Sequence, residues 1–511
     1  MIDRVRRIRR QIIQPSGPSI LDAIADPAMF KPWFKNLASW QAWFAFLSAL
    51  FALPMTDDQR AIYEECTGRT ELPDAPATEG WLCCGRRAGK SFVLAVIAVY
   101  LATFRDYRPY LQPGERGTVM VIATDRKQAR VIFRYVMGLL KGVSMFRVLI
   151  ERDRQESVDL TNGVTIEIHT ASFRSTRGLT LVACLLDEVA WYRSDESSNP
   201  DYEILNAVRP AMATIPNALL LVASSPYARR GILFNAWKRS WAKNGDPVLF
   251  WRAPTRRMNP SVPQSVIDAA MEVDAAAASA EYLAEWRADI EAFIQREAVE
   301  ACVSPGVIER PFVRGLKYSA FIDPAGGSGT DSMTLACAVK DNEAAVLVAL
   351  RERKPPFSPE EVVAEFCEVL RQYNITRVIG DKFGGEFVRE PFKRHGITYE
   401  PSARPKTDLF RDFLGLLNSR RADLLDNERL INQISSLERR TARGGRDSID
   451  HPPGAHDDLA NVAAGALVNL VVSKSSYTLD YVFSDRDEGS RFDNAVDRVA
   501  SLESMMTGRF W

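Results

Sequence analysis

Short apolar runs alternate with longer apolar or amphipathic segments along residues 81–251. The run at 81–84 predicts a strand, and the apolar stretch 92–104 predicts a helix soon after it. Further short runs rich in branched and aromatic residues predict strands at 119–123, 164–168, 181–186 and 219–223, with a late or edge strand at 248–251. Strands that alternate with helices are typical of an α/β domain built on a largely parallel sheet.

A second α/β pattern begins near Tyr318, after a segment at 263–290 that predicts a helical linker because it is rich in alanine and acidic residues. Three strand candidates follow one another, a helix and a fourth strand come next, and the last apolar helix starts near Asp458. In chain order these elements span 320–323, 334–339, 345–350, 359–373 and 378–381. Three strands, a helix and a strand form the order of a ribonuclease H-like fold.

The uncharged stretch 37–53 approaches the length that crosses a bilayer. It contains Ser39, Gln41 and Ser48, and its large side chains recur at helical spacing. It therefore predicts a helix packed on the first α/β domain rather than a membrane span, and no membrane partner is expected. We divide the chain into an N-terminal helical segment, a first α/β domain, a helical linker, a ribonuclease H-like domain and a tail, at 1–75, 76–257, 258–312, 313–473 and 474–511.

Composition excludes few function classes but limits where nucleic acid can bind. Lysine plus arginine and aspartate plus glutamate both number 65, so any surface for DNA must be local. The seven cysteines show no zinc-binding spacing, which favours reduced thiols. Two basic segments are candidates for phosphate contact. The first, 229–257, interleaves eight lysines and arginines with aromatic residues, so domain packing explains it equally well; the second comprises Arg439, Arg440, Arg443 and Arg446.

A phosphate-binding loop follows the strand predicted at 81–84. Glycines let backbone N–H groups approach phosphates closely at the start of a helix, where Lys90 would neutralise the β- and γ-phosphates and Ser91 would bind magnesium. The match departs from the usual pattern because Cys84 holds the first glycine position and Gly85 comes one place late. The candidate loop is Gly85, Arg86, Arg87, Ala88, Gly89, Lys90 and Ser91.

An acidic pair ends the strand predicted at 181–186. Asp187 would hold the magnesium of ATP through water, and Glu188 would act as the base that polarises the attacking water. Adjacent acids at the end of a buried strand are costly unless a cation compensates them, although a strand that simply emerges into solvent is the alternative. These features predict a P-loop ATPase domain of the ASCE type. The following pair, Ser224 and Ser225, either senses the γ-phosphate or forms a plain turn.

Three arginines are candidates for stabilising charge in the transition state of ATP hydrolysis. Arg86 and Arg87 lie inside the loop and would act within the same chain. Arg177 precedes the acidic strand and would serve a neighbouring subunit. Each is equally well explained as an ordinary surface arginine.

A second set of acids predicts a metal site in the ribonuclease H-like domain. Asp323 and Asp381 each close a predicted strand, and Asp457 and Asp458 start the last helix. Strand ends and a helix start can converge, and carboxylates gathered there would bind two Mg²⁺ or Mn²⁺ ions about 3.5–4 Å apart against a phosphodiester. Any one of these aspartates alone would more simply be a cap or turn residue.

Together these residues resemble the large terminase subunit of tailed double-stranded DNA phages over nearly the whole chain. The resemblance includes the aromatic helix before Thr56, the arginine-bearing loop, the acidic pair and the three-aspartate nuclease. It implies that Gln59 lies near the nucleotide base, that Arg177 is offered to the adjacent subunit, and that Asp458 rather than Asp457 is the ligand.

The resemblance also implies partners and a location. A homo-oligomeric ring, of five subunits, would dock on the portal protein of a procapsid in the host cytoplasm and leave before the virion matures. It would hydrolyse ATP to drive double-stranded DNA inward and cut the concatemer at start and finish, while a small terminase subunit recognises the packaging site. The tail at 474–511 is the candidate for portal contact.

Two other classes of protein compete with this interpretation. A cellular helicase–nuclease or an ATP-dependent transposition protein would need further helicase motifs between the domains, and the sequence lacks them. A non-catalytic assembly protein would be expected to have lost Lys90, Ser91, Asp187, Glu188 or the late acids, all of which are intact.

Overall fold

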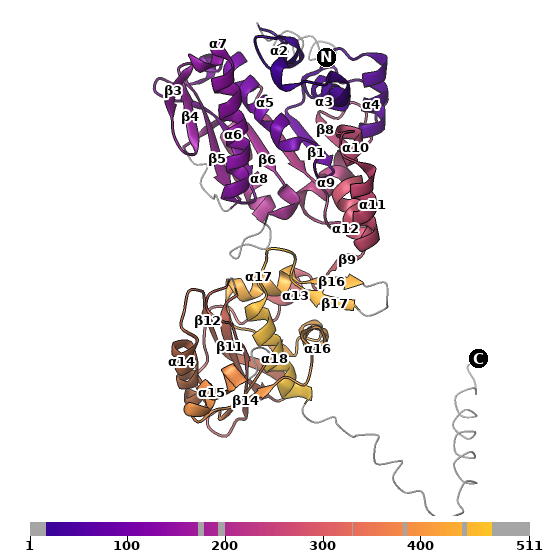
Figure 1. Ribbon diagram of the computed structural model, residues 1–511. Helices are drawn as coiled ribbons and strands as arrows, with labels where there is room; N and C mark the ends of the chain where they lie inside the picture. The colour runs from indigo at the N-terminus through magenta and orange to yellow at the C-terminus, as the bar shows by residue number, and fades with distance from the viewer. Residues whose placement is uncertain are drawn as a thin grey trace, which may run out of the picture.

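The computed structural model describes residues 17–171, 178–192, 200–329, 331–381, 386–441 and 447–472. Two α/β bodies, each built on its own large sheet, are joined by a linker (Figure 1). The expected fold class, a P-loop ATPase fold followed by a ribonuclease H-like fold, is confirmed by the strand orders described below. Arg177 and the tail at 474–511 lie outside the described residues, as do Arg443 and Arg446.

The first sheet has eight strands in the order β3-β4-β5-β2-β6-β7-β1-β8. Every neighbouring pair from β5 to β8 is parallel, as predicted. The strand that precedes the phosphate loop therefore lies beside the strand after the acidic pair, which is the P-loop ATPase order. These six strands are β1 (Glu79–Cys84), β2 (Gly117–Ala123), β5 (Val164–Thr170), β6 (Thr180–Asp187), β7 (Leu219–Ser224) and the edge strand β8 (Val248–Ala253).

The remaining strands of this sheet, β3 (Ile150–Asp153) and β4 (Ser157–Leu160), form an antiparallel hairpin that the sequence pattern did not predict. Three of the four β3 residues are exposed, so the apolar signal is weak there.

Helices cover both faces of the first sheet. Helix α5 (Lys90–Phe104) is apolar all round because it is enclosed, and α6 (Arg126–Gly142) packs beside it. The other helices of this domain are α7 (Ser144–Arg147), α8 (Pro200–Met212) and α9 (Gly231–Ser240).

The uncharged stretch at 37–53 forms a short 3₁₀ turn and helix α3 (Gln41–Phe51), which packs on this domain between α2 (Ile20–Ala25) and α4 (Asp57–Thr67). Ten of the eleven α3 residues are buried. Within the described ranges, no helix is both long and apolar enough to cross a membrane.

The second sheet has six strands in the order β14-β13-β10-β11-β12-β15. Strands β10, β11 and β12 are antiparallel neighbours, and β13 is parallel to β10, which is the ribonuclease H-like order. The strands are β10 (Tyr318–Asp323), β11 (Met333–Asp341), β12 (Ala344–Arg353), β13 (Arg377–Gly380), β14 (Thr398–Pro401) and β15 (Ala422–Asp423).

Helix α18 (Asp458–Val472) packs across the middle of the second sheet, against β10, β11 and β12. The helix approaches so closely that a Cβ on Gly465 would lie 2.3 Å from the Phe321 ring. This close packing brings the start of α18 to the ends of β10 and β13. The remaining helices are α14 (Pro359–Gln372), α15 (Glu386–Arg394), α16 (Lys406–Asn418) and α17 (Glu428–Ser436).

The linker is helical only in part. Helices α10 (Thr255–Met258), α11 (Gln264–Val273) and α12 (Ala275–Leu283) are followed by a turn at Ala284 and then by strand β9 (Ile290–Ala292) and helix α13 (Arg296–Glu300). The expectation of a helix through residue 290 is therefore wrong at its end. Strand β9 pairs with the hairpin of β16 (Glu438–Thr441) and β17 (Asp447–Asp450), so a long-range partner decides its structure.

All seven cysteines are buried, free thiols. Burial raises the pKa of Cys66 and of Cys83 to about 12, so these thiols stay protonated at neutral pH.

Candidate active sites

The phosphate loop joins the end of β1 to the start of α5. Gly89 adopts a left-handed conformation, and a Cβ on Gly85 would lie 2.3 Å from the Thr255 hydroxyl oxygen. Cys84 is the last residue of β1 and is buried, and its carbonyl accepts a hydrogen bond from Lys90 Nζ at 3.1 Å. The missing first glycine is tolerated because that position is an ordinary strand residue.

Asp187 ends β6 with no exposed surface, facing the loop. Its Oδ2 accepts hydrogen bonds from the Ser91 hydroxyl at 3.2 Å and from Gln128 Nε2 at 3.3 Å. Among the described residues, its Oδ1 has no hydrogen-bond partner although it is buried. Burial, and then the charge of Glu188, raises the pKa of Asp187. An orphaned carboxylate oxygen beside a serine hydroxyl fits the magnesium ion of a bound nucleotide.

Glu188 follows Asp187 in a left-handed backbone conformation (φ 55°), which is rare for a residue with a Cβ. Its Oε1 lies 3.2 Å from Lys90 Nζ. Its Oε2 accepts from the Ser225 backbone N–H at 3.2 Å and from the Ser224 hydroxyl at 3.3 Å. The serine pair at the end of β7 therefore contacts the proposed base directly rather than forming only a turn.

The other predicted nucleotide-site residues have varied surroundings. Arg86 and Arg87 are exposed, and Arg86 Nη1 donates to Glu281 of helix α12 at 3.0 Å. Ala88 is buried within the loop. Gln59 is buried and forms a capping box with Thr56 at the start of α4. Arg177 lies outside the described residues.

Trp43 is a residue of this site that the sequence pattern did not identify. It is 1 % exposed, and its indole N–H donates to the Ala88 carbonyl at 3.0 Å, across 45 residues of sequence. Helix α3 thereby holds one carbonyl of the phosphate loop through a side-chain hydrogen bond. From the sequence, a tryptophan in an apolar helix is expected to be a core residue. Only the hydrogen bond to Ala88 shows that it also supports the phosphate loop.

We expect Trp43→Phe to lower kcat/KM for ATP hydrolysis about tenfold, because the Ala88 carbonyl would lose a buried hydrogen bond that holds the phosphate loop in place. Steady-state phosphate release measured against ATP concentration checks this as kcat/KM. Trp251→Phe is the matched control, since Trp251 is also buried but donates to Met258 Sδ. Equal activity in the two variants would contradict the anchoring role.

The acids of the second domain meet where β10, β13 and α18 end or begin. Ile322 pairs with Gly380, so Asp323 and Asp381 leave adjacent parallel strands at the same level. Oδ2 of Asp323 and Oδ2 of Asp381 accept hydrogen bonds from the same nitrogen, Asn461 Nδ2, at 2.7 and 2.8 Å. Asp381 follows β13 rather than closing it, a small difference from the prediction.

Asp458 lies at the start of α18 and accepts from the Ser332 backbone N–H at 3.1 Å. Burial, and then the negative charge of Asp381, raises the pKa of Asp323 to about 8, and Asp458 adds to this effect. Among the described residues, Asp323, Asp381 and Asp458 do not form a group whose ligand oxygens all lie within 4.8 Å of one another, so the three acids do not surround a single cation position in this arrangement. Carboxylate oxygens are ligands that suit Mg²⁺ or Mn²⁺.

Asp457 was also predicted to bind metal, but its side chain is used differently. Its Oδ2 lies 2.6 Å from Lys406 Nζ, which also pairs with Asp450 Oδ1 at 3.0 Å. Asp450, His451 and Asp457 are close enough to hold an ion, but the lysine already compensates their charge. The structure therefore differs from the prediction that Asp457 binds a metal ion, because the Lys406 ammonium group lies where that metal ion would be.

Part of the first basic segment makes contacts within its own domain. Arg239 pairs with Glu79, Arg257 pairs with Glu65, and Trp237 stacks on Phe234. In the second basic segment, Arg439 pairs with Asp447 across the hairpin, and Arg440 Nη2 donates to the His451 carbonyl at 3.0 Å. The geometry thus favours the packing alternative for the first segment.

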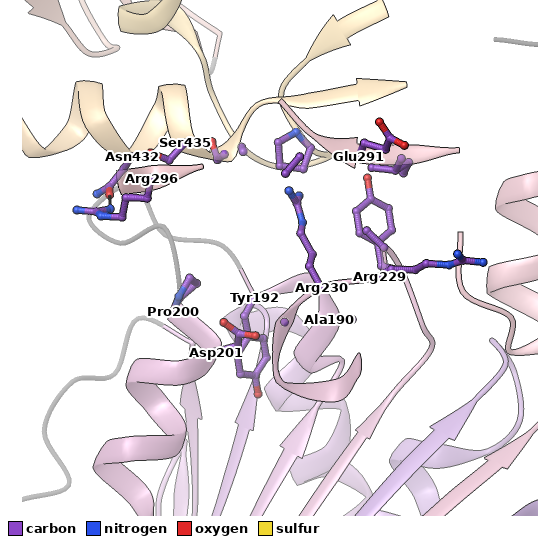
Figure 2. A pocket seen from close by; sticks show the side chains of 18 of the residues that line it. Ala190, Tyr192, Pro200, Asp201, Arg229, Arg230, Glu291, Arg296, Asn432 and Ser435 are labelled. Carbon is purple, nitrogen blue, oxygen red and sulfur yellow. Dashed lines mark hydrogen bonds between the residues drawn. The ribbon is translucent and has the colours of Figure 1, made fainter. Parts of the chain in front are cut away.

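The two domains meet through polar contacts around a cavity of about 680 Å³. Glu438, which has no exposed surface, accepts from the Tyr227 hydroxyl at 2.8 Å and pairs with Arg230. Figure 2 shows side chains from the ATPase domain below the cavity and from the linker and second domain above it. Tyr227 and Ala228 contribute to only a small apolar cluster with Ile290. Such polar junctions favour relative motion of domains.

No family model and no curated protein matches this chain in sequence. The solved structures that it resembles include phage large terminases. That of bacteriophage HK97 is 16% identical and covers 76% of this chain and 91% of its own, with a TM-score of 0.35. A large terminase from a thermophilic bacteriophage is 14% identical and covers 85% and 98%, with a TM-score of 0.36. The large terminase nuclease of another thermophilic phage, G20c, is 15% identical and covers 33% and 94%, with a TM-score of 0.28.

Proposed function

We propose that this chain is a large terminase subunit, the ATP-driven motor and nuclease that packages double-stranded phage DNA. One observation carries the proposal: a single chain holds a nucleotide site and a separate carboxylate site, each built on its own sheet. The contact of Glu438 with Tyr227 joins the two domains close to the nucleotide site, because Tyr227 lies two residues beyond the serine that touches Glu188. A protein that hydrolyses ATP and cuts DNA through connected domains fits translocation followed by cleavage.

In the nucleotide site, each side chain would have a separate role in phosphoryl transfer. Lys90 now pairs with Glu188. Phosphates of a bound ATP would attract Lys90, and Glu188 would then be available to take a proton from the attacking water. Ser91 and Asp187 would hold the magnesium ion, which neutralises charge on the phosphates. Arg86 and Arg87 lie in the loop as candidates to stabilise the transition state, with Arg177 of a neighbouring subunit as a third.

In the nuclease site, Asp323, Asp381 and Asp458 would hold two Mg²⁺ or Mn²⁺ ions. Such ions supply an activated water and stabilise both the attacking and the leaving oxygen of a phosphodiester. The chain's own contribution is to gather these acids at one edge of the sheet and to hold Asp458 at a helix start.

The partners follow from the same proposal. The subunits would assemble as a ring, of five copies, on the portal of a procapsid in the host cytoplasm, with a small terminase subunit selecting the DNA. The alternative is another ATP-dependent DNA-processing protein, such as a helicase–nuclease or a transposition protein.

Purified full-length protein tests this proposal in two assays, with and without procapsids that carry a portal. We expect ATP hydrolysis, manganese-dependent cleavage of plasmid DNA, and DNA that becomes resistant to added nuclease only when procapsids and ATP are both present. ATP-dependent strand separation without any effect of procapsids would favour the helicase–nuclease alternative. Protein with neither activity would favour an assembly role.

A further inference from the structure

Asn461 is a polar side chain enclosed between the acids of the nuclease site. It lies one turn beyond Asp458 on α18 and is 1 % exposed. Its Nδ2 donates to Asp323 Oδ2 at 2.7 Å and to Asp381 Oδ2 at 2.8 Å. Its Oδ1 is buried and has no hydrogen-bond partner among the described residues.

One amide nitrogen thus occupies a position between two carboxylates that a bridging cation would also occupy. Its N–H groups carry partial positive charge and offset the repulsion of two close acids. The opposite orientation of the amide would set Oδ1 against two carboxylate oxygens, which the observed geometry avoids. An N–H donor and a divalent cation therefore compete for the same two oxygens.

We propose that Asn461 is a positioning residue that holds Asp323 and Asp381 together until a cation enters, and then releases both. This inference rests on the proposed nuclease function. Each binding event would break two hydrogen bonds, so the asparagine lowers the affinity for metal while it keeps the site assembled. The residue acts through the acids and does not itself contact the phosphodiester.

Thermal unfolding of the full-length protein, with EDTA or with saturating MnCl₂, tests the inference. In EDTA, Asn461→Leu is expected to lower the Tm of the metal-sensitive transition by about 3 °C or more, because the acids lose their shared donor. In MnCl₂ the difference from wild type should largely disappear, since the cation replaces the donor. Titration calorimetry should show the apparent Kd for Mn²⁺ falling about tenfold.

Asn469→Leu is the matched control, because Asn469 lies two turns further along the same helix and its side-chain nitrogen has no partner among the described residues. Its Tm difference from wild type should be the same in both solutions. Asn461→Ala is measured alongside, in case leucine prevents folding.

Equal Tm losses with and without Mn²⁺ in the Asn461 variants would assign the residue to packing and overturn the inference. A larger loss in Mn²⁺ would assign its oxygen as a ligand, which also overturns it. If Mn²⁺ does not raise the Tm of the wild-type protein, the metal site itself fails, and the proposed nuclease function fails with it.

Discussion

Replacing Glu188 with glutamine is expected to reduce ATP turnover by about 10²- to 10⁴-fold, because glutamine keeps the shape but cannot accept a proton from water. The side chain contacts Lys90, Ser224 and Ser225, so its position is defined on both sides. Phosphate release under saturating ATP measures the loss. Nucleotide affinity and manganese-dependent nicking of plasmid DNA should stay within about twofold of wild type, since neither uses this base.

Glu272→Gln provides the control for this substitution, because Glu272 is an exposed residue of α11 with the same charge. If Glu188→Gln kept more than half of the wild-type turnover, Glu188 would not be the base of ATP hydrolysis. Simultaneous loss of nicking would instead indicate that the protein had not folded.

The opposite pattern is expected when Asp323 is replaced by asparagine. Nicking should fall about a hundredfold or more, since residues that only support metal ligands already cost about 10- to 100-fold, whereas ATP turnover should remain within about twofold. Supercoiled plasmid incubated with Mn²⁺ measures cleavage. Asp341→Asn is the control, because Asp341 is exposed at the far end of β11. Loss of both activities in a folded Asp323→Asn protein would contradict two separate sites.

The Asp323→Asn substitution should also change how the thermal stability of the nuclease domain depends on pH. Burial, and then the negative charge of Asp381, raises the pKa of Asp323 to about 8, above its ordinary value of 3.8. A raised pKa means that the native state holds the proton more tightly than the unfolded state does. The protonated Asp323 carboxyl therefore contributes fully to the free energy of unfolding below about pH 4, and this contribution is lost as pH rises through 8. In EDTA, the Tm of the nuclease domain should therefore fall across this range more steeply in wild type than in Asp323→Asn.

Local pattern was enough to predict the elements that carry the chemistry. The apolar run of α5 after β1, the acids at the end of β6 and the succession of β10, β11, β12, α14 and β13 along the chain were predictable from local pattern, because those segments are buried or end at the sheet edge.

The remaining features depend on partners far away in the sequence. Strand β9 is an edge segment whose structure is decided by the hairpin near Glu438, about 150 residues later. Trp43 and Asn461 look like core residues in their own helices, and only long-range contacts connect them with the sites. Asp457 and Asp458 are adjacent and of the same type, so the sequence cannot tell that one faces Lys406 and the other faces Ser332.

The enclosed thiols make the chain suited to site-specific fluorescent labelling. Maleimide dyes react with accessible thiolates, so the seven native cysteines should remain unmodified in the folded protein. Val148→Cys and Glu343→Cys would place one dye on each domain, because both positions are exposed. Energy transfer between such dyes would then report, in single molecules, whether the distance between the two domains changes during each cycle of nucleotide turnover.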